Sequence, residues 1–209
     1  MADSNGGLLG LKWAFASLAV FLIGAGFVSI AGAKSRMATN EPYVTCLGGT
    51  FYARAIPEEE KGTKGKTTIY RVCRDQDEVI EAYAWYAPDG LHLGWSPIAG
   101  KVAAMAVGGT PTKDPSERVE FSFYLGAEHL TTYKTADLIK LGLWSNGLQH
   151  ESRLTHGLRV SGCEQIPRTN EYVFRIVLDT NQGEKTIDFD ILTGKPYDPA
   201  KAATRPAHD

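Results

Sequence analysis

The residues with the clearest capacity for chemistry are histidines in the last third of the chain. His150, Glu151 and His156 form the pattern H-E-x-x-x-x-H. A zinc protease places its two histidines four residues apart, one helical turn, so that both rings reach one ion. A spacing of six puts the rings on different faces of a helix, although a loop can still bring them together. These three residues, with His129 beside an aromatic-rich strand, are the candidates for acid–base or metal chemistry, and a polar loop is the favoured interpretation.

A second segment resembles a phosphate-binding loop only at its end. The run 61–67, KGTKGKT, closes with Gly-Lys-Thr, but the glycine that such a loop needs earlier is replaced by Glu60. Neighbouring glutamates would repel phosphate, and the residues that follow read as a strand. We therefore expect no nucleotide and no cofactor. The net charge of −2 also argues against nucleic-acid binding.

The three cysteines, Cys46, Cys73 and Cys163, permit one disulfide and one free thiol. The sequence leaves the pairing open. Cys46 and Cys73 lie on neighbouring predicted strands, so theirs is the first pair to consider. The chain has no C-x-x-C pair, so we expect no structural zinc site.

Four aromatic residues flank a predicted turn at Pro88-Asp89. They are Tyr83, Trp85, Tyr86 and Trp95. Such residues either pack in a core or form an exposed contact surface for a partner, a glycan or a lipid surface. The sequence leaves both interpretations open.

The longest uncharged run in the chain is residues 13–33, WAFASLAVFLIGAGFVSIAGA, after a short flank at 1–12. It is long enough to cross a bilayer as a helix. It predicts a transmembrane anchor, with a cleaved signal peptide and a buried helix as alternatives. Small residues at helical spacing predict a packing face for other membrane subunits, namely Ala25, Ser29, Gly32 and Ala33.

Two sets of features predict opposite orientations of this span in the membrane. Lys12 precedes the span, while Lys34 and Arg36 follow it, which leans toward a cytoplasmic C-terminal domain. The β-rich pattern, the cysteines and an A-x-A triplet at 31–33 favour export. We expect a single-pass membrane protein whose domain is extracytoplasmic, in the periplasm.

The rest of the chain predicts one domain of mostly strands. We expect a linker at 34–42, a β-rich domain at 43–197 and a loose tail at 198–209. Strands are predicted at 43–55, 67–74, 102–107, 118–125, 159–161, 172–178 and 186–191, the first interrupted by Gly48-Gly49. Residues 75–86 read either as a helix or, preferably, as a strand that turns at 87–90 into residues 91–95.

One prominent helix is predicted at 135–146. Thr135 is positioned to cap its first turn, Asp137 suits the dipole there, and Asn146-Gly147 is a typical stop. The predicted fold class is therefore α+β, with an N-terminal transmembrane helix followed by one β-rich domain with a single prominent helix.

The order of helix 135–146, strand 159–161, strand 172–178 and a last strand ending Asp190-Ile191-Leu192-Thr193-Gly194 resembles the PepSY-type pattern. The resemblance covers about the last third of the chain. It implies a small extracytoplasmic module, often regulatory or inhibitory, and it carries over no catalytic residue.

These patterns favour a non-enzymatic, membrane-anchored accessory, assembly or scaffold subunit of an envelope complex. Its expected partners are the lipid bilayer and other membrane-protein subunits, with neither nucleic acid nor nucleotide. Two alternatives stay open. One is an anchored hydrolase or metal-dependent enzyme, and the other is a β-rich carrier of a small ligand or lipid.

Overall fold

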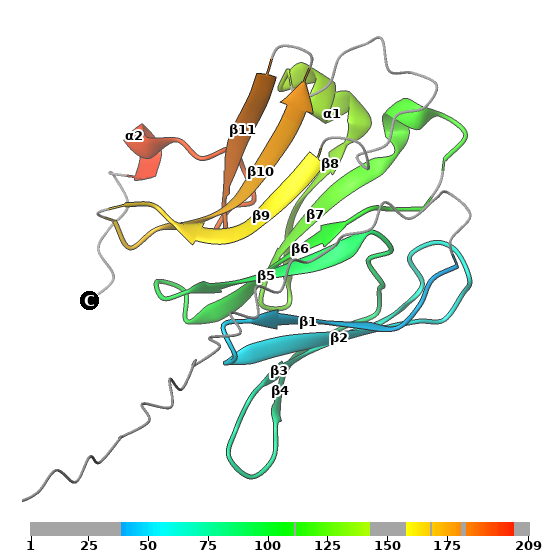
Figure 1. Ribbon diagram of the computed structural model, residues 1–209, viewed down its shortest axis with the longest axis vertical. Helices are drawn as coiled ribbons and strands as arrows, with labels where there is room; N and C mark the ends of the chain where they lie inside the picture. The colour runs from blue at the N-terminus through cyan, green and yellow to red at the C-terminus, as the bar shows by residue number, and fades with distance from the viewer. Residues whose placement is uncertain (1–38, 111, 143–157, 168, 181–182, 203–209) are drawn as a thin grey trace, which may run out of the picture. The chain divides into compact units, whose positions relative to one another are not determined.

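Three antiparallel sheets make up the fold of the computed structural model, which describes residues 39–110, 112–142, 158–167, 169–180 and 183–202 (Figure 1). The N-terminal sheet holds β1 (Tyr43–Leu47), β2 (Phe51–Pro57), β3 (Gly65–Arg71) and β4 (Glu78–Tyr83). The central sheet holds β5 (Gly90–Ser96), β6 (Lys101–Val107), β7 (Val119–Leu125) and β8 (Glu128–Lys134). The C-terminal sheet, in the order β11-β10-β9, holds β9 (Leu158–Gln165), β10 (Tyr172–Thr180) and β11 (Gly183–Asp190). Three short helices accompany them: η1 (Pro115–Glu117), α1 (Thr135–Lys140) and α2 (Pro199–Ala202).

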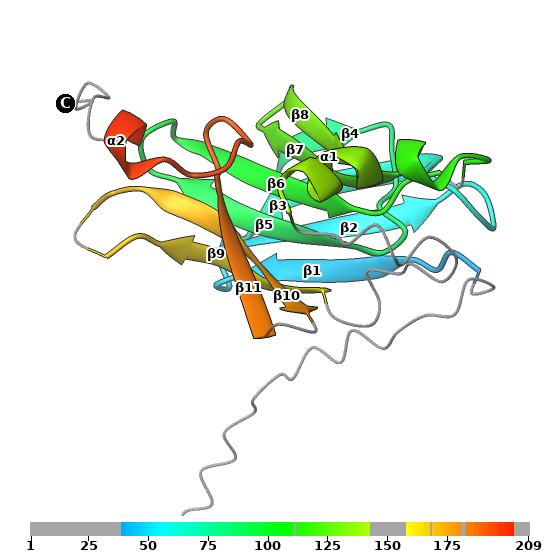
Figure 2. The ribbon, with the colours of Figure 1, turned by 90° about the horizontal axis from the view of Figure 1, so that it is seen from above.

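The central sheet contributes to two separate hydrophobic cores. Side chains of successive residues on a strand point to opposite faces. Along β6, Val102, Ala104 and Ala106 pack in the core shared with the N-terminal sheet. Ala103, Met105 and Val107 pack in the core shared with the C-terminal sheet. The central sheet is therefore the middle layer, as Figure 1 also shows, and Figure 2 gives the view from above, with the sheets overlapping.

This double burial explains why β6 reads KVAAMAV, an apolar run without alternation. A strand covered on one face alternates apolar and polar residues, whereas a strand covered on both faces does not. The same reason accounts for Glu120 on β7, which is 3% exposed although the alternation of this strand predicts a polar outer side. The strands predicted at 102–107 and 118–125 are confirmed, and β8 is an additional strand.

The first predicted strand, 43–55, is a hairpin instead. Gly48 and Gly49 have φ of 56° and 76°, and the N–H of Thr50 donates to the carbonyl of Leu47 at 3.1 Å. Two successive residues with positive φ make the tight turn that best fits a two-stranded hairpin, and glycine adopts this conformation without a steric cost. The pair of glycines therefore separates β1 from β2.

Residues 75–86 contain a strand and not a helix. β4 pairs with β3, whereas β5 pairs with β6, so the turn at 87–90 joins two different sheets. The two strands were predicted correctly, but the hairpin between them was wrong. The Thr67 hydroxyl donates to the carbonyl of Trp85 at 2.8 Å and fixes this crossover to β3.

The predicted α+β class with one prominent helix is wrong, because the described residues form mostly antiparallel sheet. α1 has six residues and ends early: Gly142 adopts a φ of 66°, and its N–H donates to the carbonyl of Ile139 at 2.8 Å. Asp137 accepts the N–H of Lys134 at 3.2 Å, as its place in the first turn predicts. Thr135 does not cap the helix, because its hydroxyl donates to Glu120. The remainder of the predicted helix, 143–146, lies outside the described residues.

The predicted transmembrane anchor at 13–33, with its packing face of Ala25, Ser29, Gly32 and Ala33, lies outside the described residues. Where the structure describes the chain, it contains no helix long and apolar enough to span a bilayer. The prediction of a single-pass membrane protein with a periplasmic domain is corrected accordingly, since the structure gives it no support. The membrane partners that depended on this span stay untested.

The strands predicted at 172–178 and 186–191 are confirmed as β10 and β11, which pair antiparallel with each other. Phe174 and Ile176 are buried on one face and Val173 on the other. After β11, Asp190 holds a turn: its carboxylate accepts the N–H of Leu192 at 2.9 Å and the hydroxyl of Thr193 at 3.2 Å. The elements behind the PepSY resemblance follow in the expected order, but order alone does not establish that family, so the resemblance stays a prediction.

Candidate binding surface

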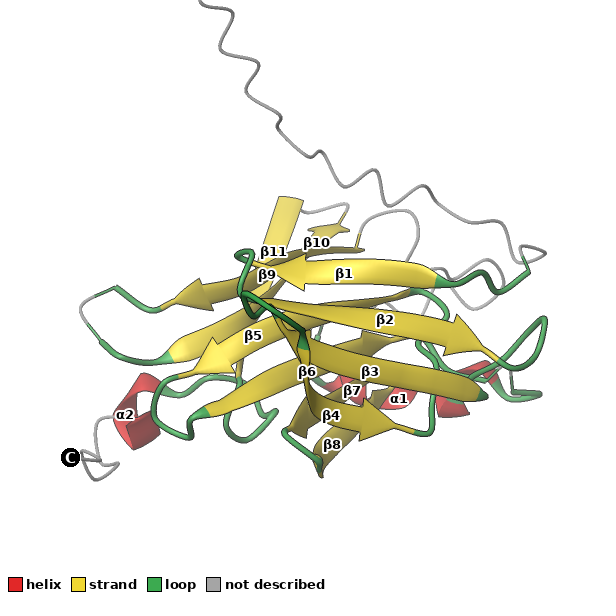
Figure 3. Ribbon diagram, turned by 90° about the horizontal axis from the view of Figure 1, so that it is seen from below, coloured by secondary structure: helices red, strands yellow, loops and turns green. Residues whose placement is uncertain are grey.

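The outer face of the N-terminal sheet, turned away from the cores, carries large apolar side chains that are exposed to solvent. Val44, Val79 and Ile56 are 59%, 56% and 37% exposed, and Val72, just past the end of β3, is 48% exposed. The register brings Val44, Val79 and Ile56 to one face: Cys46 pairs with Tyr52, Tyr52 with Tyr70 and Tyr70 with Val79, while Val44 lies two residues from Cys46 and Ile56 four residues from Tyr52. We call this set the outer face, and Figure 3 shows the strands that form it.

Two tyrosines form the rigid centre of the outer face. The rings of Tyr52 and Tyr70 stack with centroids 4.8 Å apart, and the Tyr52 hydroxyl donates to Asp77 at 2.9 Å. This hydrogen bond raises the pKa of Tyr52 above its usual range. Both tyrosines are half-buried, and tyrosines held in this way offer contact area at a low cost in side-chain entropy, which is why tyrosine is frequent in protein interfaces.

Two cations share the outer face with these tyrosines. Arg54 pairs with Val44 and Thr68 across the strands, and Lys66 pairs with Ile56. Both cations are exposed. The outer face thus combines apolar, aromatic and basic side chains, and tyrosine and arginine are enriched in protein-binding surfaces.

A shallow recess lies at the end of the core between the N-terminal and central sheets. It has a volume of about 540 Å³. Its floor is a stacked pair, Phe51 and Trp95, with centroids 5.2 Å apart and an angle of 16° between the rings. The Arg71 guanidinium lies 5.7 Å from the centroid of the Phe51 ring and binds Glu78 at 3.1 Å. Its complete lining is Leu47, Gly48, Thr50, Phe51, Arg71 and Trp95.

The four aromatic residues singled out in the sequence lie in three different clusters. Trp85 stacks on both Tyr83 and Tyr124 of the central sheet, and the Tyr83 ring contacts that of Tyr124 at an angle of 53°. Tyr86 contacts Tyr43, and Trp95 stacks on Phe51 as described above. Tyr83 and Tyr86 are buried, at 8% and 2% exposure, whereas Trp85 and Trp95 are half-buried. The structure therefore does not bring these four residues together.

The histidine candidates form no catalytic group among the described residues. His129 is bonded through Nε2 to the Thr132 hydroxyl at 2.9 Å and packs edge-on against the Tyr124 ring. His150, Glu151 and His156 lie outside the described residues. In the described part of the chain, no three His, Cys, Asp or Glu side chains are arranged to hold a metal ion.

All three cysteines are unpaired in the structure. Cys46 and Cys73 are exposed, and β2 separates β1 from β3. Two strand spacings amount to roughly 9–10 Å, which exceeds the ~7 Å limit between the Cα atoms of a disulfide. Cys73 also lies past the end of β3, so the pair considered first does not form here. Burial raises the pKa of the half-buried Cys163 thiol to about 11.

A polar cluster lies where β7 meets α1. The Thr135 hydroxyl donates to Glu120 at 2.6 Å, and the Nε of Arg118 lies 3.8 Å from the same carboxylate oxygen. Arg118 also binds Asp89 at 3.2 Å. The other Glu120 oxygen has no hydrogen-bond partner within the described structure. Burial raises the pKa of Glu120, while Thr135 and Arg118 act in the opposite direction.

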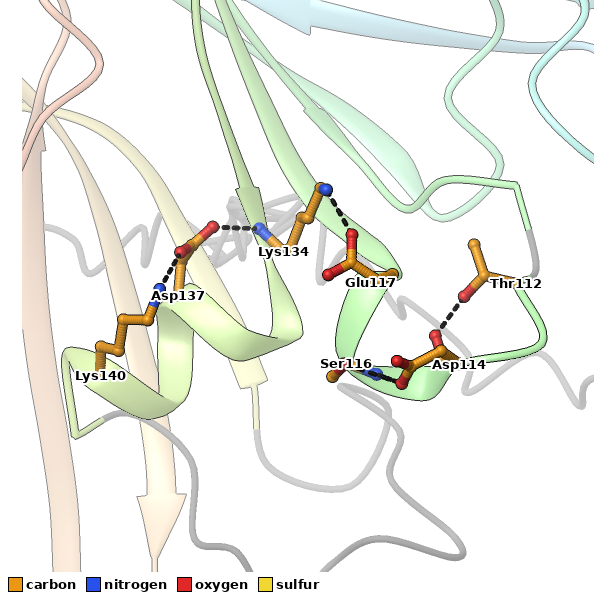
Figure 4. Close-up of polar contacts among 7 residues, drawn as sticks. All are labelled: Thr112, Asp114, Ser116, Glu117, Lys134, Asp137 and Lys140. Atoms are coloured by element: carbon orange, nitrogen blue, oxygen red, sulfur yellow. Dashed lines mark hydrogen bonds and ion pairs between the residues drawn. The ribbon is translucent and has the colours of Figure 1, made fainter.

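Exposed polar contacts continue from this cluster along η1 and α1 (Figure 4). Lys134 binds Glu117, which raises the pKa of Lys134, and Asp137 binds Lys140 at 3.2 Å. The drawing also includes the turn formed by Thr112, Asp114 and Ser116. Exposed ion pairs contribute little to stability. We interpret this group as local support for η1 and α1.

Glu120 predicts a specific pH dependence of stability. Its folded-state pKa is raised above the unfolded value, so its contribution is fully present below the unfolded pKa and is lost as the pH rises through the folded pKa. The variant Glu120→Gln cannot ionise. We therefore expect its unfolding free energy, measured by urea titration from about pH 5 to about pH 8, to improve relative to the wild type as the pH rises. A difference that stays constant with pH would contradict this interpretation.

The sequence analysis missed the outer face and the recess. The alternation in β1 and β2 was a usable signal for strands, but it does not say which side faces solvent.

Comparison with known proteins finds no matching family model, no matching curated protein and no matching solved structure.

Proposed function

We propose that the protein is a non-enzymatic accessory or scaffold protein that holds a partner protein on the outer face of its N-terminal sheet. The observation that carries this proposal is the exposure of Val44, Val79 and Ile56 on one sheet face. Isolated exposed apolar residues are normal on a protein surface, but several on one sheet face, beside charged residues, are typical of an interaction site.

The composition of the outer face supports a protein partner. The tyrosine stack of Tyr52 and Tyr70 supplies a preorganised aromatic centre. Arg54 and Lys66 supply cations beside Val44 and Ile56. Aromatic and arginine side chains are enriched at the positions that contribute most to protein–protein affinity. The fixed orientation of Tyr52, through its bond to Asp77, lowers the entropy lost on binding.

Photo-crosslinking in the source cells tests the proposal without knowledge of the partner. A benzophenone amino acid replaces Val79 on the outer face in one variant and Thr186, exposed on β11 of the C-terminal sheet, in the other. After irradiation, we expect a discrete heavier adduct from position 79 and none from position 186. Adding Val44→Glu to the first variant places a charge on the same face and should remove the adduct.

Two results would overturn the proposal. One is the absence of an adduct at position 79 with a normal amount of folded protein. The other is an equal set of adducts at positions 79 and 186, since this would indicate random encounters. The melting temperature of Val44→Glu, compared with that of the wild type, establishes that a lost adduct is not caused by unfolding.

A further inference from the structure

The recess at the end of β1 and β5 shares no residue with the outer face, and aromatic side chains and one arginine line it. At about 540 Å³, it falls within the ~300–1,000 Å³ range of small-molecule sites. Its lining is mainly apolar, with one charged side chain, Arg71. A small number of polar groups in an apolar lining is the usual composition of a ligand site.

The aromatic floor selects flat groups. Phe51 is 6% exposed and lies under both Trp95 and the Arg71 guanidinium. Trp95 is only half-buried, so part of its indole remains accessible in the recess. A planar ring entering the recess extends the existing stack, in the offset geometry that aromatic pairs prefer.

Arg71 selects an anion. In the described structure its guanidinium is bonded through one nitrogen, Nη1, to Glu78, and both side chains are solvent-exposed, at 43% and 55%. Exposed ion pairs of this kind are weak, so exchange of Glu78 for another carboxylate costs little. A guanidinium has five N–H donors in a fork that matches a carboxylate.

The turn between β1 and β2 borders the recess. Gly48 lines the recess, and a Cβ at this position would meet no heavy atom within 4 Å. Glycine suits this position because of the positive φ of the turn and not because of close packing.

We propose that this recess binds a planar aromatic or heteroaromatic carboxylate, with the ring on Trp95 and the carboxylate on Arg71. The recess is shallow, so the affinity is modest, with a Kd on the order of 0.1 mM for a bicyclic ring. This site is independent of the protein-binding function proposed for the outer face.

Calorimetric titration of the full-length protein with 2-naphthoate tests the site. We expect saturable binding by the wild type, and at least about tenfold weaker binding by Arg71→Gln and by Trp95→Leu. Arg54→Gln on the outer face removes the same charge three residues along β2 from Phe51 and should leave the Kd unchanged. The neutral analogue 2-naphthalenemethanol should bind the wild type about tenfold more weakly than 2-naphthoate does. Its affinity for Arg71→Gln should equal its affinity for the wild type.

Three outcomes would overturn the proposal. The first is no binding of 2-naphthoate by the wild type at millimolar concentration. The second is an equal loss for Arg71→Gln and Arg54→Gln, which would indicate a general charge effect. The third is a loss of binding by Val79→Glu, since this variant changes only the outer face and would place the naphthyl ring there. Melting temperatures of all variants show whether they are folded.

Discussion

Replacing Phe123 by alanine is expected to lower the unfolding free energy by about 3–5 kcal/mol, measured by urea titration. Phe123 on β7 is 1% exposed. Its ring centroid lies 5.2 Å from that of Phe189, 6.0 Å from that of Phe174 and 5.9 Å from that of Tyr133. Removing the ring therefore opens a cavity between the central and C-terminal sheets, and the loss is a large part of a typical domain's ~5–15 kcal/mol.

The conservative variant Phe123→Leu is the matched control. It keeps most of the buried volume, so its cost should stay below about 1.5 kcal/mol. A loss of less than about 1 kcal/mol for Phe123→Ala would mean that the core between these two sheets is loosely packed or that the ring is not buried there.

Placing an aspartate at Ala103 or at Ala104 is expected to prevent folding in both cases. These neighbours on β6 are each 0% exposed, but Ala103 belongs to the core with the C-terminal sheet and Ala104 to the core with the N-terminal sheet. An unpaired buried charge costs several kcal/mol, which is comparable to the whole stability of the domain. Circular dichroism and soluble yield measure the effect.

Ala82→Asp provides the control for this pair. Ala82 lies on β4 opposite Thr68 and is exposed, so the same substitution should leave the protein folded. If either Ala103→Asp or Ala104→Asp folds normally, one face of the central sheet is open to water, and the three-layer arrangement is wrong.

The parts of the fold that the sequence predicted well depend on local patterns. The hairpin of β10 and β11 shows alternation on both sides of one turn, so its strands were found nearly to their ends. The position of Asp137 in the first turn of α1 was also predicted, because the dipole effect is local to a helix end.

The errors arose where tertiary structure overrides a local pattern. Gly48-Gly49 fits both a strand irregularity and a tight turn, and the pairing of β1 with β2 decides between them. The early end of α1 at Gly142 was missed because an apolar arc continues beyond it in sequence. The turn at 87–90 joins two sheets, and a sequence cannot distinguish such a crossover from a hairpin.

The candidate sites were less predictable than the strands. The outer face exists because register aligns Val44, Tyr52, Tyr70 and Val79 from separate strands, and register depends on contacts that are distant in sequence. The recess needs β1, β3 and β5 to end at the same place. Trp95 was noticed in the sequence, but its partner Phe51 was not, because nothing local relates residues on different sheets.

The protein's own cysteines allow the most direct measurement of the central claim, that the outer face is covered by a partner protein. Cys46 is exposed on this face opposite Tyr52, whereas Cys73 is exposed beyond the end of β3. Each thiol is labelled with a maleimide in two samples, a native extract and the protein purified to a single component. Mass spectrometry measures the rate at which each thiol is labelled. We expect Cys46 to react much more slowly in the extract than after purification, and Cys73 to react at the same rate in both. Equal rates for Cys46 in the two samples would contradict the account.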